Sequence, residues 1–506
     1  MTTLPADSNQ PWWKLLNGYH WFVLIVAALG WLFDCLDQQI FLLARVPAMK
    51  ALLDPGQNIN EFSGYATAIF LIGWAVGGLF FGVLGDRIGR AKTMLITILL
   101  YSVFTGLSAL STGFWDFALY RFLTGLGVGG EFAVGVALVA EVMPDRARPY
   151  ALGLLQALSA VGNVSAALIS IGFGHLETTG AIGVGSGWRW MFFAGAFPAL
   201  LAIVIRMKLK EPQKWVAAKA ADTAKKLGSY GELFGNPNWK TPAVGAGASV
   251  AIIILIAFAG PDAWNKLVIG VSLALVAIGF LLWTVFGGGK PASEAPWRRN
   301  AIVGLTLACA GVIGLWGIVF FVFDLVGSVL GKQFAAAGMP ADQIPGEVIK
   351  WKGIASLYLN GGAFFGIYGF GLLSQRIGRR PTFAIAFIAA MITTAFVFLK
   401  FNSTAHVAWM MPLLGFTMLG IFGGYAIYFP ELFPTHLRST GTSFCYNVGR
   451  FVSASGPAVL GLLTSRVFSE HDEPMRYAGV CMCAIFLVGL AVLPFAPETR
   501  GRPLPE

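Results

Sequence analysis

Apolar residues along this 506-residue chain come in long runs rather than in the alternating or 3.6-residue patterns of half-buried strands and helices. Each run is about 20 residues long, which allows a helix to cross the roughly 30 Å hydrocarbon core of a bilayer. The pattern therefore predicts an all-α polytopic membrane protein with 14 transmembrane helices. These spans are expected at about 21–44, 62–84, 93–110, 115–140, 150–173, 188–207, 242–260, 266–286, 301–329, 353–373, 381–399, 406–430, 437–463 and 477–496.

The predicted spans divide into two sets of six and one inserted pair. We expect an N-terminal six-helix half at 1–207, a basic cytoplasmic loop at 208–241, an inserted transmembrane hairpin with its linker at 242–300, and a C-terminal six-helix half at 301–506. The inserted pair has few polar residues and no buried charge. It is therefore predicted to be an accessory hairpin that packs outside the transport path.

Charge is scarce and unevenly placed. Only 12% of the residues are charged, where a soluble domain carries roughly 25%. The formal net charge of +10 would suggest nucleic acid as the partner of a soluble chain, but most lysines and arginines fall in loops on one side of the predicted membrane. The positive-inside rule makes that side the cytoplasm and places both termini there. We expect a multi-pass protein of the cell (inner or plasma) membrane that contacts the lipid bilayer and has no nucleic-acid partner.

The sequence offers no pattern typical of an enzyme or of a cofactor site. All five cysteines lie inside apolar runs, and neither a disulfide framework nor a metal site is indicated. Gly125, Gly127 and Gly130 fit a dinucleotide-binding spacing, but no strand precedes them, so close helix packing is the better interpretation. We expect no cofactor, no bound metal and no catalytic residues.

The chain repeats itself. Gly73, Gly77 and Gly82 recur at one constant offset as Gly362, Gly366 and Gly371, and the charged residues that follow them recur as well. Chance explains two or three such matches but not a whole series in one register. Two homologous six-helix halves follow, which is an architecture of secondary transporters.

The loop after the second span reads GVLGDRIGR (82–90), and its counterpart reads GLLSQRIGRR (371–380). Glycines let helices approach closely, and a basic cluster with Asp86 can bind the cytoplasmic end of a neighbouring helix as a latch. Ser374 and Gln375 replace Gly85 and Asp86 in the second copy, so its latch is expected to be weaker. The alternative is that the cluster only anchors the loop to anionic headgroups. The candidate gating residues are Gly82, Asp86, Arg87, Gly89, Arg90, Glu141, Arg148, Arg376, Arg379, Glu431 and Arg438.

These loops resemble the signature loop of the major facilitator superfamily, and further motifs extend the resemblance over both halves. The segment 121–149 is similar to the fourth span of metabolite:proton symporters, and FDCLDQQI (33–40) resembles the first span of aromatic-acid and niacin transporters. EPQKW (211–215) and PETRGR (497–502) resemble sugar porters. The resemblance implies the major facilitator fold, a monomer, and transport of a small-molecule substrate by alternating access.

Charged groups inside predicted spans are functional candidates because each costs several kcal/mol at the bilayer centre. Asp37 and Arg121 both lie roughly 10 Å below the outer surface at 1.5 Å per residue, so they can meet. The resemblance to sugar porters implies that they form a proton-linked pair; the alternative is a static structural ion pair. Asp34, one helical turn before Asp37, and Glu131, deeper in the fourth span, are further candidates for proton coupling.

Arg450 breaks the internal symmetry, because its position in the first half is Ala160. An arginine that faces a cavity can bind a carboxylate through two hydrogen bonds; the alternative role is a structural partner such as Glu131. Further candidates for substrate binding, each of which alone is more often a packing residue, are Asn447, Tyr446, Gln156, Trp316, Asp324, Tyr358, Asn360 and Tyr425.

Together these features predict a proton-coupled symporter of a small, carboxylated organic metabolite. Asp324 is acidic and favours a zwitterion or cation instead. The first alternative is a uniporter or antiporter of a sugar or organic cation. A non-transporting membrane receptor is the second. It would need a signalling domain, and the largest soluble segment has only about 33 residues.

Overall fold

The computed structural model describes residues 10–57, 59–183, 185–198, 200, 205, 208–220, 227–235, 296–340, 344–453, 459–460 and 463–505. These residues form helices and turns, and no strand occurs among them, which confirms the all-α fold class. Nine of the helices described are long and apolar enough to cross a membrane. The count of 14 stays a prediction, because the inserted pair at 242–260 and 266–286 lies outside the described residues.

The first half of the chain contains six main helices, most of them longer than the predicted spans because their polar ends continue past the apolar run. The sixth predicted span is described mainly over its first turns. The bounds are α1 (Gly18–Leu52), α2 (Ile59–Ile88), α3 (Arg90–Ser108), α4 (Phe114–Val142), α5 (Arg148–Thr178) and α6 (Gly187–Gly195), preceded by the 3₁₀ helix Trp12–Leu15 and followed by the short helices α8 (Gln213–Ala220) and α9 (Tyr230–Phe234).

The second half begins with a span that is not one continuous α-helix. A π-helical turn at Gly314–Ile318 and a 3₁₀ turn at Val319–Phe321 interrupt it, and such turns often mark functional sites. The bounds are α12 (Pro296–Ile313), α13 (Val322–Ala336), α14 (Ile344–Ile377), α15 (Arg379–Lys400), α16 (Thr404–Glu431), α17 (Arg438–Ser453), the π-helical turn Leu463–Val467, α19 (Pro474–Met482), α20 (Ile485–Val492) and the 3₁₀ turn Leu493–Phe495.

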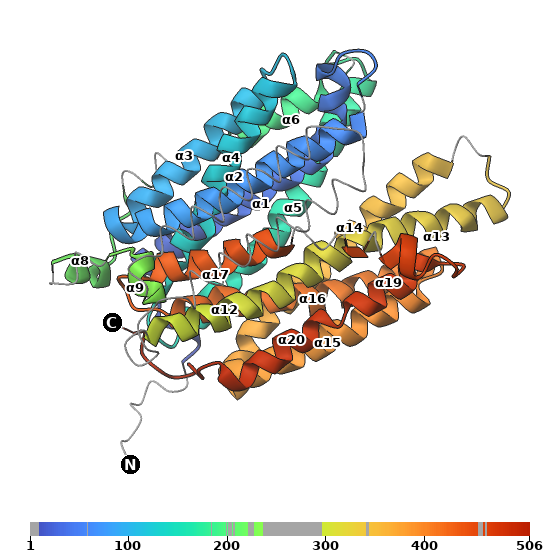
Figure 1. The fold of residues 1–506 in the computed structure, drawn as a ribbon. Helices are drawn as coiled ribbons and strands as arrows, with labels where there is room; N and C mark the ends of the chain where they lie inside the picture. The colour runs from blue at the N-terminus through green and yellow to red at the C-terminus, as the bar shows by residue number, and fades with distance from the viewer. Residues whose placement is uncertain are drawn as a thin grey trace.

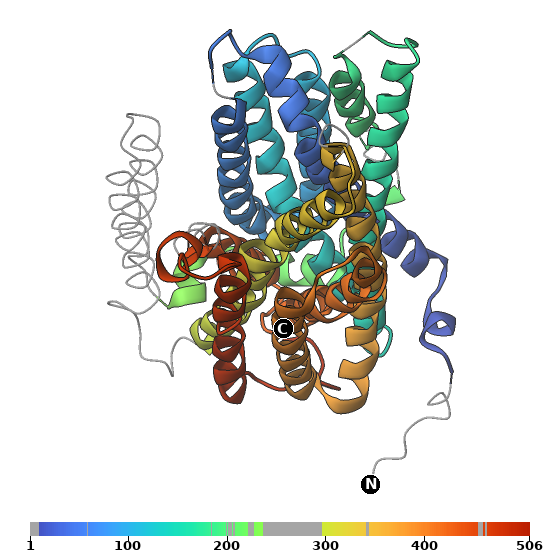
Figure 2. The ribbon, with the colours of Figure 1, turned by 90° about the vertical axis from the view of Figure 1, so that its right-hand side faces the viewer.

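The helices form two bundles, α1–α6 and α12–α20, that lean together at one end and separate toward the other (Figures 1 and 2). Across the boundary, α17 packs against α2 and α14 packs against α5. We call the end where the bundles meet, beside α8 and α9, the closed end, and the opposite end the open end (Figure 1). Both termini approach the closed end: Trp12 stacks on Tyr150 at the start of α5, and the Pro505 carbonyl accepts a hydrogen bond from Arg438 at the start of α17.

Each bundle uses the repeated glycines in the same way. A Cβ atom on Gly73 or Gly77 of α2 would lie 2.2 or 2.0 Å from a backbone carbonyl oxygen of α4. A Cβ on Gly362 or Gly366 of α14 would lie 1.9 or 2.0 Å from a carbonyl oxygen of α16. These close approaches, rather than a hydrophobic driving force between helices, hold each pair together.

Candidate central cavity

A cavity of about 770 Å³ lies between the two bundles, in the part of the molecule nearer the open end. Its wall comes from α1, α5, α14, α16, α17 and the π-helical turn at Gly314–Ile318. Apolar side chains such as Trp31 and Phe422 form most of this wall. A large, mostly apolar cavity with a few polar groups is the usual form of a small-molecule site.

All charge on the cavity wall is positive among the described residues, because the wall contains Arg450, Lys350 and Lys352 and no acidic side chain. The two lysines lie near the beginning of α14 and form ion pairs outside the cavity. Lys350 Nζ is 3.1 Å from Glu347, and Lys352 Nζ is 3.3 Å from Asp324. Arg450, which lies deeper, is therefore the principal positive group available to a ligand.

The Arg450 guanidinium lies between two aromatic rings. Its central carbon is 3.8 Å from the centre of the Trp74 ring on α2 and 4.1 Å from that of Tyr446 on α17. Tyr446 in turn stacks on Phe132 of α4, with ring centres 4.1 Å apart. Nε and Nη1 of Arg450 donate no hydrogen bond to the part of the chain described here. The rings fix the plane of the guanidinium and leave donors free for an incoming carboxylate.

Asp37 and Arg121 meet, as their depths suggested. Arg121 Nη1 is 3.6 Å from Asp37 Oδ1, and both side chains are fully buried. Thr105 donates a hydrogen bond of 2.5 Å to the same carboxylate oxygen. Arg121 also donates to Ser108 (2.7 Å) and lies over the Phe192 ring at 4.7 Å. Neither member of the pair lines the cavity, so the pair is a separate buried site within the first bundle.

Asp34 and Glu131 are buried as well. Glu131 accepts a hydrogen bond of 2.8 Å from Thr97 on α3, and no ion pair joins it to Arg450 among the described residues. Asp34 is fully buried, and neither of its oxygens accepts a hydrogen bond of normal geometry from the described chain.

Gln156, Trp316, Asn360 and Tyr446 line the cavity together with Arg450. Asn163 of α5 donates a hydrogen bond of 3.1 Å to Asn360 of α14 and thereby links the two bundles.

The other four candidates for substrate binding do not line the cavity. Tyr358 is 43% exposed and points away from the cavity, and Asp324 faces outward to its ion pair with Lys352. Tyr425 donates to the Leu307 carbonyl at 2.5 Å within the second bundle, and Asn447 donates to the Ser443 carbonyl at 3.1 Å below the cavity. These positions differ because successive side chains of an α-helix point about 100° apart around its axis. A residue next to a lining residue in the sequence therefore faces away from the cavity.

Trp74 was missed by the sequence reasoning. In the sequence, a single tryptophan in an apolar run looks like any packing residue. Only its contact with Arg450 in the structure sets Trp74 apart from them. Thr105 and Ser108 were missed for a similar reason, because hydroxyl groups in spans commonly bond to their own helix.

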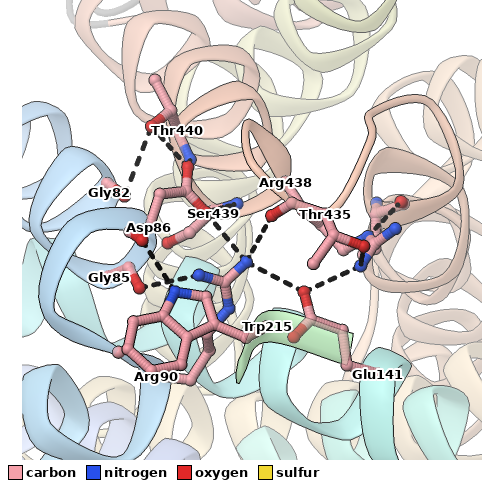
Figure 3. Close-up of polar contacts among 12 residues, drawn as sticks. Gly82, Gly85, Asp86, Arg90, Glu141, Trp215, Thr435, Arg438, Ser439 and Thr440 are labelled. Carbon is pink, nitrogen blue, oxygen red and sulfur yellow. Dashed lines mark hydrogen bonds and ion pairs between the residues drawn. The ribbon is translucent and has the colours of Figure 1, made fainter. Parts of the chain in front are cut away.

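Four gating candidates of the first half lie close to the start of α17, where the two bundles meet: Gly82, Asp86, Arg90 and Glu141 (Figure 3). The Asp86 carboxylate accepts hydrogen bonds from the backbone N–H groups of Ser439 (3.1 Å) and Thr440 (2.8 Å), and from the Thr440 hydroxyl (2.6 Å). These groups form the first turn of α17, where the helix dipole favours a negative charge. Asp86 on α2 therefore caps a helix of the other bundle.

Arg90 extends this contact. It pairs with Asp86 and with Glu141, each at 2.9 Å, and donates to the Thr435 carbonyl at 2.6 Å (Figure 3). Glu141 also pairs with Arg438 of the second bundle at 2.7 Å. These buried charges join α2, α3 and α4 to the segment that leads into α17.

Among the remaining gating candidates, the ion pairs of Arg148 and Arg379 stay within their own bundle, whereas Gly82 contacts α17 of the other bundle. Arg148 pairs with Asp145, and Arg379 pairs with Glu431 at 2.8 Å. Arg376 is exposed. Gly82 lies against Ser443, which a Cβ would approach within 2.5 Å, and Gly89 has a φ of +116° at the sharp turn into α3. Arg87 donates to the Leu227 carbonyl at 3.3 Å, so it holds the segment that leads into α9.

Comparison with known proteins assigns the family. The model of the family named "Sugar (and other) transporter" matches residues 15–232 and 334–506. A niacin transporter of Acinetobacter baylyi is 26% identical over 505 residues, covering 97% of this chain and 96% of that protein. A cis,cis-muconate transport protein of the same organism is 26% identical over 409 residues, with 80% and 78% covered.

Solved structures show the same fold. A proton:xylose symporter of the major facilitator superfamily superposes with a TM-score of 0.64 at 16% identity, covering 96% of this chain and 98% of that one. A human organic anion transporter gives a TM-score of 0.59 at 15% identity, with 94% and 100% covered. The chain therefore belongs to the sugar (and other) transporter family: it is a multi-pass membrane transporter of the major facilitator superfamily and not an enzyme.

Proposed function

We propose that the protein is a proton-coupled symporter of a small, carboxylated organic metabolite, and that this structure is its outward-open state. The observation that carries the proposal is the cavity wall, on which Arg450 has unpaired donors and no acidic side chain occurs among the described residues. Such a site favours an anion over a cation and offers a carboxylate a planar two-donor partner. The names of two relatives, the cis,cis-muconate and niacin transporters, agree with a carboxylated substrate.

The positive-inside rule supports the orientation. With basic loops in the cytoplasm, the closed end and both termini face the cytoplasm and the cavity opens to the outside. We also propose that the protein acts as a monomer in the cell membrane. Transport requires the contacts of Asp86, Arg90 and Glu141 to break, so that the closed end opens while the other end closes around the substrate.

The buried pair of Asp37 and Arg121 is the second part of the proposal. An ionised Asp37 holds Arg121, whereas a protonated Asp37 releases most of that attraction. The charge state of the pair can therefore bias the packing of α1 against α4. Glu131 lies deeper on α4, and in this proposal it takes part in a later protonation step.

Transport by the purified protein in proteoliposomes tests the function directly. Uptake of nicotinate, cis,cis-muconate, xylose and choline is measured with and without an outward-acidic pH gradient. We expect a carboxylate to accumulate above equilibrium only with the gradient, and xylose and choline to show no uptake. Uptake of only the sugar or the cation, or carboxylate uptake that ignores the gradient, contradicts the proposal.

Replacement of Asp37 by asparagine separates coupling from substrate recognition. Asp37→Asn keeps the size of the side chain but removes the titrating group, so gradient-driven accumulation is expected to fall at least tenfold while substrate exchange continues. The measurement compares accumulation with counterflow in the same liposomes. Unchanged proton-driven uptake by this variant would show that Asp37 is only a structural partner of Arg121.

A further inference from the structure

Trp74 of α2 contacts Arg450 of α17 across the boundary between the two bundles. The centre of the Trp74 ring lies 3.8 Å from the central carbon of the guanidinium, and Trp74 is buried. Arg450 lines the cavity whereas Trp74 does not, so the ring lies behind the cavity wall. The indole N–H has no hydrogen-bond partner among the described residues, although a buried tryptophan usually has one. The face of the ring, and not its N–H group, therefore makes the polar contact of this side chain.

The second face of the guanidinium continues the stack. Tyr446 lies 4.1 Å from it, and the Tyr446 ring stacks in turn on Phe132 of α4 with ring centres 4.1 Å apart. Trp74 and Phe132 belong to the first bundle, whereas Arg450 and Tyr446 belong to the second. Two side chains of the second bundle are thus held between two aromatic rings of the first.

The contact of Trp74 with Arg450 is the first of four that join α2 to α17. The α2 positions are four residues apart, so they share one face of the helix. In order from the cavity to the closed end, Trp74 contacts Arg450, Gly78 lies against Asn447, Gly82 lies against Ser443, and Asp86 caps Ser439 and Thr440. We call these four contacts the α2–α17 ladder. It connects the cavity wall directly to the contacts that must break when the closed end opens.

We propose that Trp74 is a positioning residue that couples the binding of a carboxylate at Arg450 to the opening of the closed end. This inference rests on the proposed function. The attraction between a cation and an aromatic face is electrostatic, so it depends on the net charge of the cation. A carboxylate that binds the free edge of Arg450 neutralises that charge. The attraction to Trp74 then weakens, and the α2–α17 ladder loses strength at the end next to the cavity.

The coupling has two consequences. With an empty cavity, the charged guanidinium keeps its contact with Trp74 and the closed end stays shut, which opposes opening without a substrate. Linkage is reciprocal, so a contact that the ligand weakens must also weaken ligand binding by the same factor. A weaker attraction between Trp74 and Arg450 should therefore tighten carboxylate binding, whereas a residue that only supports the site would weaken binding when it is altered.

Fluorinated tryptophan at position 74 of the full-length protein tests the coupling. Fluorine withdraws charge from the face of the ring and changes its shape little, so one, two and three fluorines weaken the attraction stepwise. Spin labels at the exposed positions Lys92 and Arg500, in a background without the native cysteines, report the separation of the bundles at the closed end. Distances are measured without ligand and with nicotinate or cis,cis-muconate, at the pH of fastest uptake, and calorimetry gives the Kd.

We expect the carboxylate to raise the inward-open to outward-open ratio of wild type about 3- to 10-fold. Three fluorines should raise this ratio by about the same factor without ligand, and the ligand should then add less than about twofold. The Kd should tighten by about two- to fivefold. The control is the same series at Trp31, which lines the cavity and packs on Phe132 but contacts no cation among the described residues. It should leave the ligand-free distances unchanged.

Three results overturn the inference while carboxylate transport remains: a wild-type closed end that ignores the bound carboxylate, a fluorine series that matches wild type, or a Kd that weakens with each fluorine. If the fluorinated proteins do not fold, as judged by their thermal unfolding, the response of the wild-type closed end to the carboxylate decides alone. If wild type binds neither carboxylate and transports only the sugar or the cation, the proposed function fails together with the inference.

Discussion

At the scale of single residues, the buried arginines Arg450 and Arg121 differ in what their guanidinium groups contact. Arg450 is held between Trp74 and Tyr446, and attraction between a cation and an aromatic face compensates part of the cost of its burial. Because those contacts use the faces of the guanidinium, its edge with the N–H donors remains free. Arg121 is different, since Asp37, Ser108 and Thr124 occupy its edge. The first arginine lines the cavity and can reach a ligand, whereas the second lies outside the cavity and pairs with Asp37.

Replacement of Arg450 by lysine tests the importance of the planar fork. Lysine keeps the positive charge but loses the paired donors and most of the stacking, so we expect carboxylate binding to weaken by about 1.5–3 kcal/mol, roughly 10- to 150-fold in Kd. The measurement is calorimetry with the carboxylate that wild type binds.

Lys352→Gln is the matched control, because this lysine also lines the cavity but is already paired with Asp324. An exposed ion pair contributes about 0.2–1 kcal/mol, so the control should change the Kd by less than about fivefold. Wild-type affinity in Arg450→Lys would exclude a two-donor contact.

At the scale of helices, the packing depends on small residues and on caps. Because the glycines of α2 and α14 have no Cβ atom, backbone carbonyl groups of α4 and α16 can pack directly against them. The turns that follow are also equivalent. Gly89 and Gly378 have φ of +116° and +100°, and the carboxylates of Glu211 and Glu498 accept the first backbone N–H groups of α3 and α15. The sequence repeat is therefore a repeat of physical contacts.

Gly77→Ala is expected to destabilise the first bundle. The added methyl group would lie 2.0 Å from the Leu126 carbonyl oxygen, and backbone atoms cannot move aside cheaply. We expect a loss of about 1–3 kcal/mol, seen as a lower Tm in detergent. Gly172→Ala on α5 is the control, because no atom lies within 4 Å of its Cβ position and alanine favours a helix. Equal Tm values for the two variants would contradict this account of the packing.

Glu498 gives a stability contribution that depends on pH. Burial alone would raise the pKa of Glu498, but the backbone N–H groups of Arg379, Arg500 and Arg380 stabilise the carboxylate and hold its pKa below the usual range. A lowered pKa stabilises the folded protein above the unfolded pKa of about 4.3, and the contribution is lost as the pH falls through the folded value.

Glu498→Gln should therefore weaken the cap and lower the free energy of unfolding at pH 7 by about 0.5–2 kcal/mol, which is seen as a lower Tm. The difference from wild type should shrink as the pH is lowered below about 4, which thermal scans at several pH values can follow. A difference that stays constant down to the lowest pH would mean that the carboxylate charge is not the stabilising feature.

At the scale of the whole molecule, the sequence predicts what is periodic or one-dimensional. Runs of apolar residues gave the spans, the offset between motifs gave the repeat, and depth along rigid helices brought Asp37 and Arg121 together. The direction in which each side chain points around its helix could not be predicted from these patterns. Tyr358 and Tyr425 were therefore expected at the cavity but lie off it, whereas Asn360 does line it. The π-helical turn at Gly314–Ile318 was equally hidden, because an apolar run has the same appearance with or without it.

The two halves are also unequal at the closed end. In the first, Asp86 crosses the boundary to cap α17, whereas Gln375 stands at the equivalent position of the second. There, α14 and α5 approach through Gly371 and Gly153 rather than through an ion. The segment that leads into α9 adds a second bridge, because Tyr230 donates to the Leu79 carbonyl of α2 and Gly228 donates to the His436 carbonyl of the other bundle. Opening of the closed end must therefore break contacts mainly on the α2–α17 side.

Asp86→Asn should shift the protein toward its inward-open state. Asparagine removes the negative charge from the first turn of α17 and from Arg90, so we expect the closed end to lose about 1–3 kcal/mol, enough to raise the open population roughly 5- to 150-fold. Spin labels at the exposed positions Lys92 and Arg500, in a background without the five native cysteines, report the separation of the bundles at this end.

Gln375→Ala is the control, since this side chain does not cross the boundary, and it should leave the distance distribution close to wild type. If Asp86→Asn also leaves that distribution unchanged, the cap on α17 does not hold the closed end, and the bridge through α9 becomes the contact to break next.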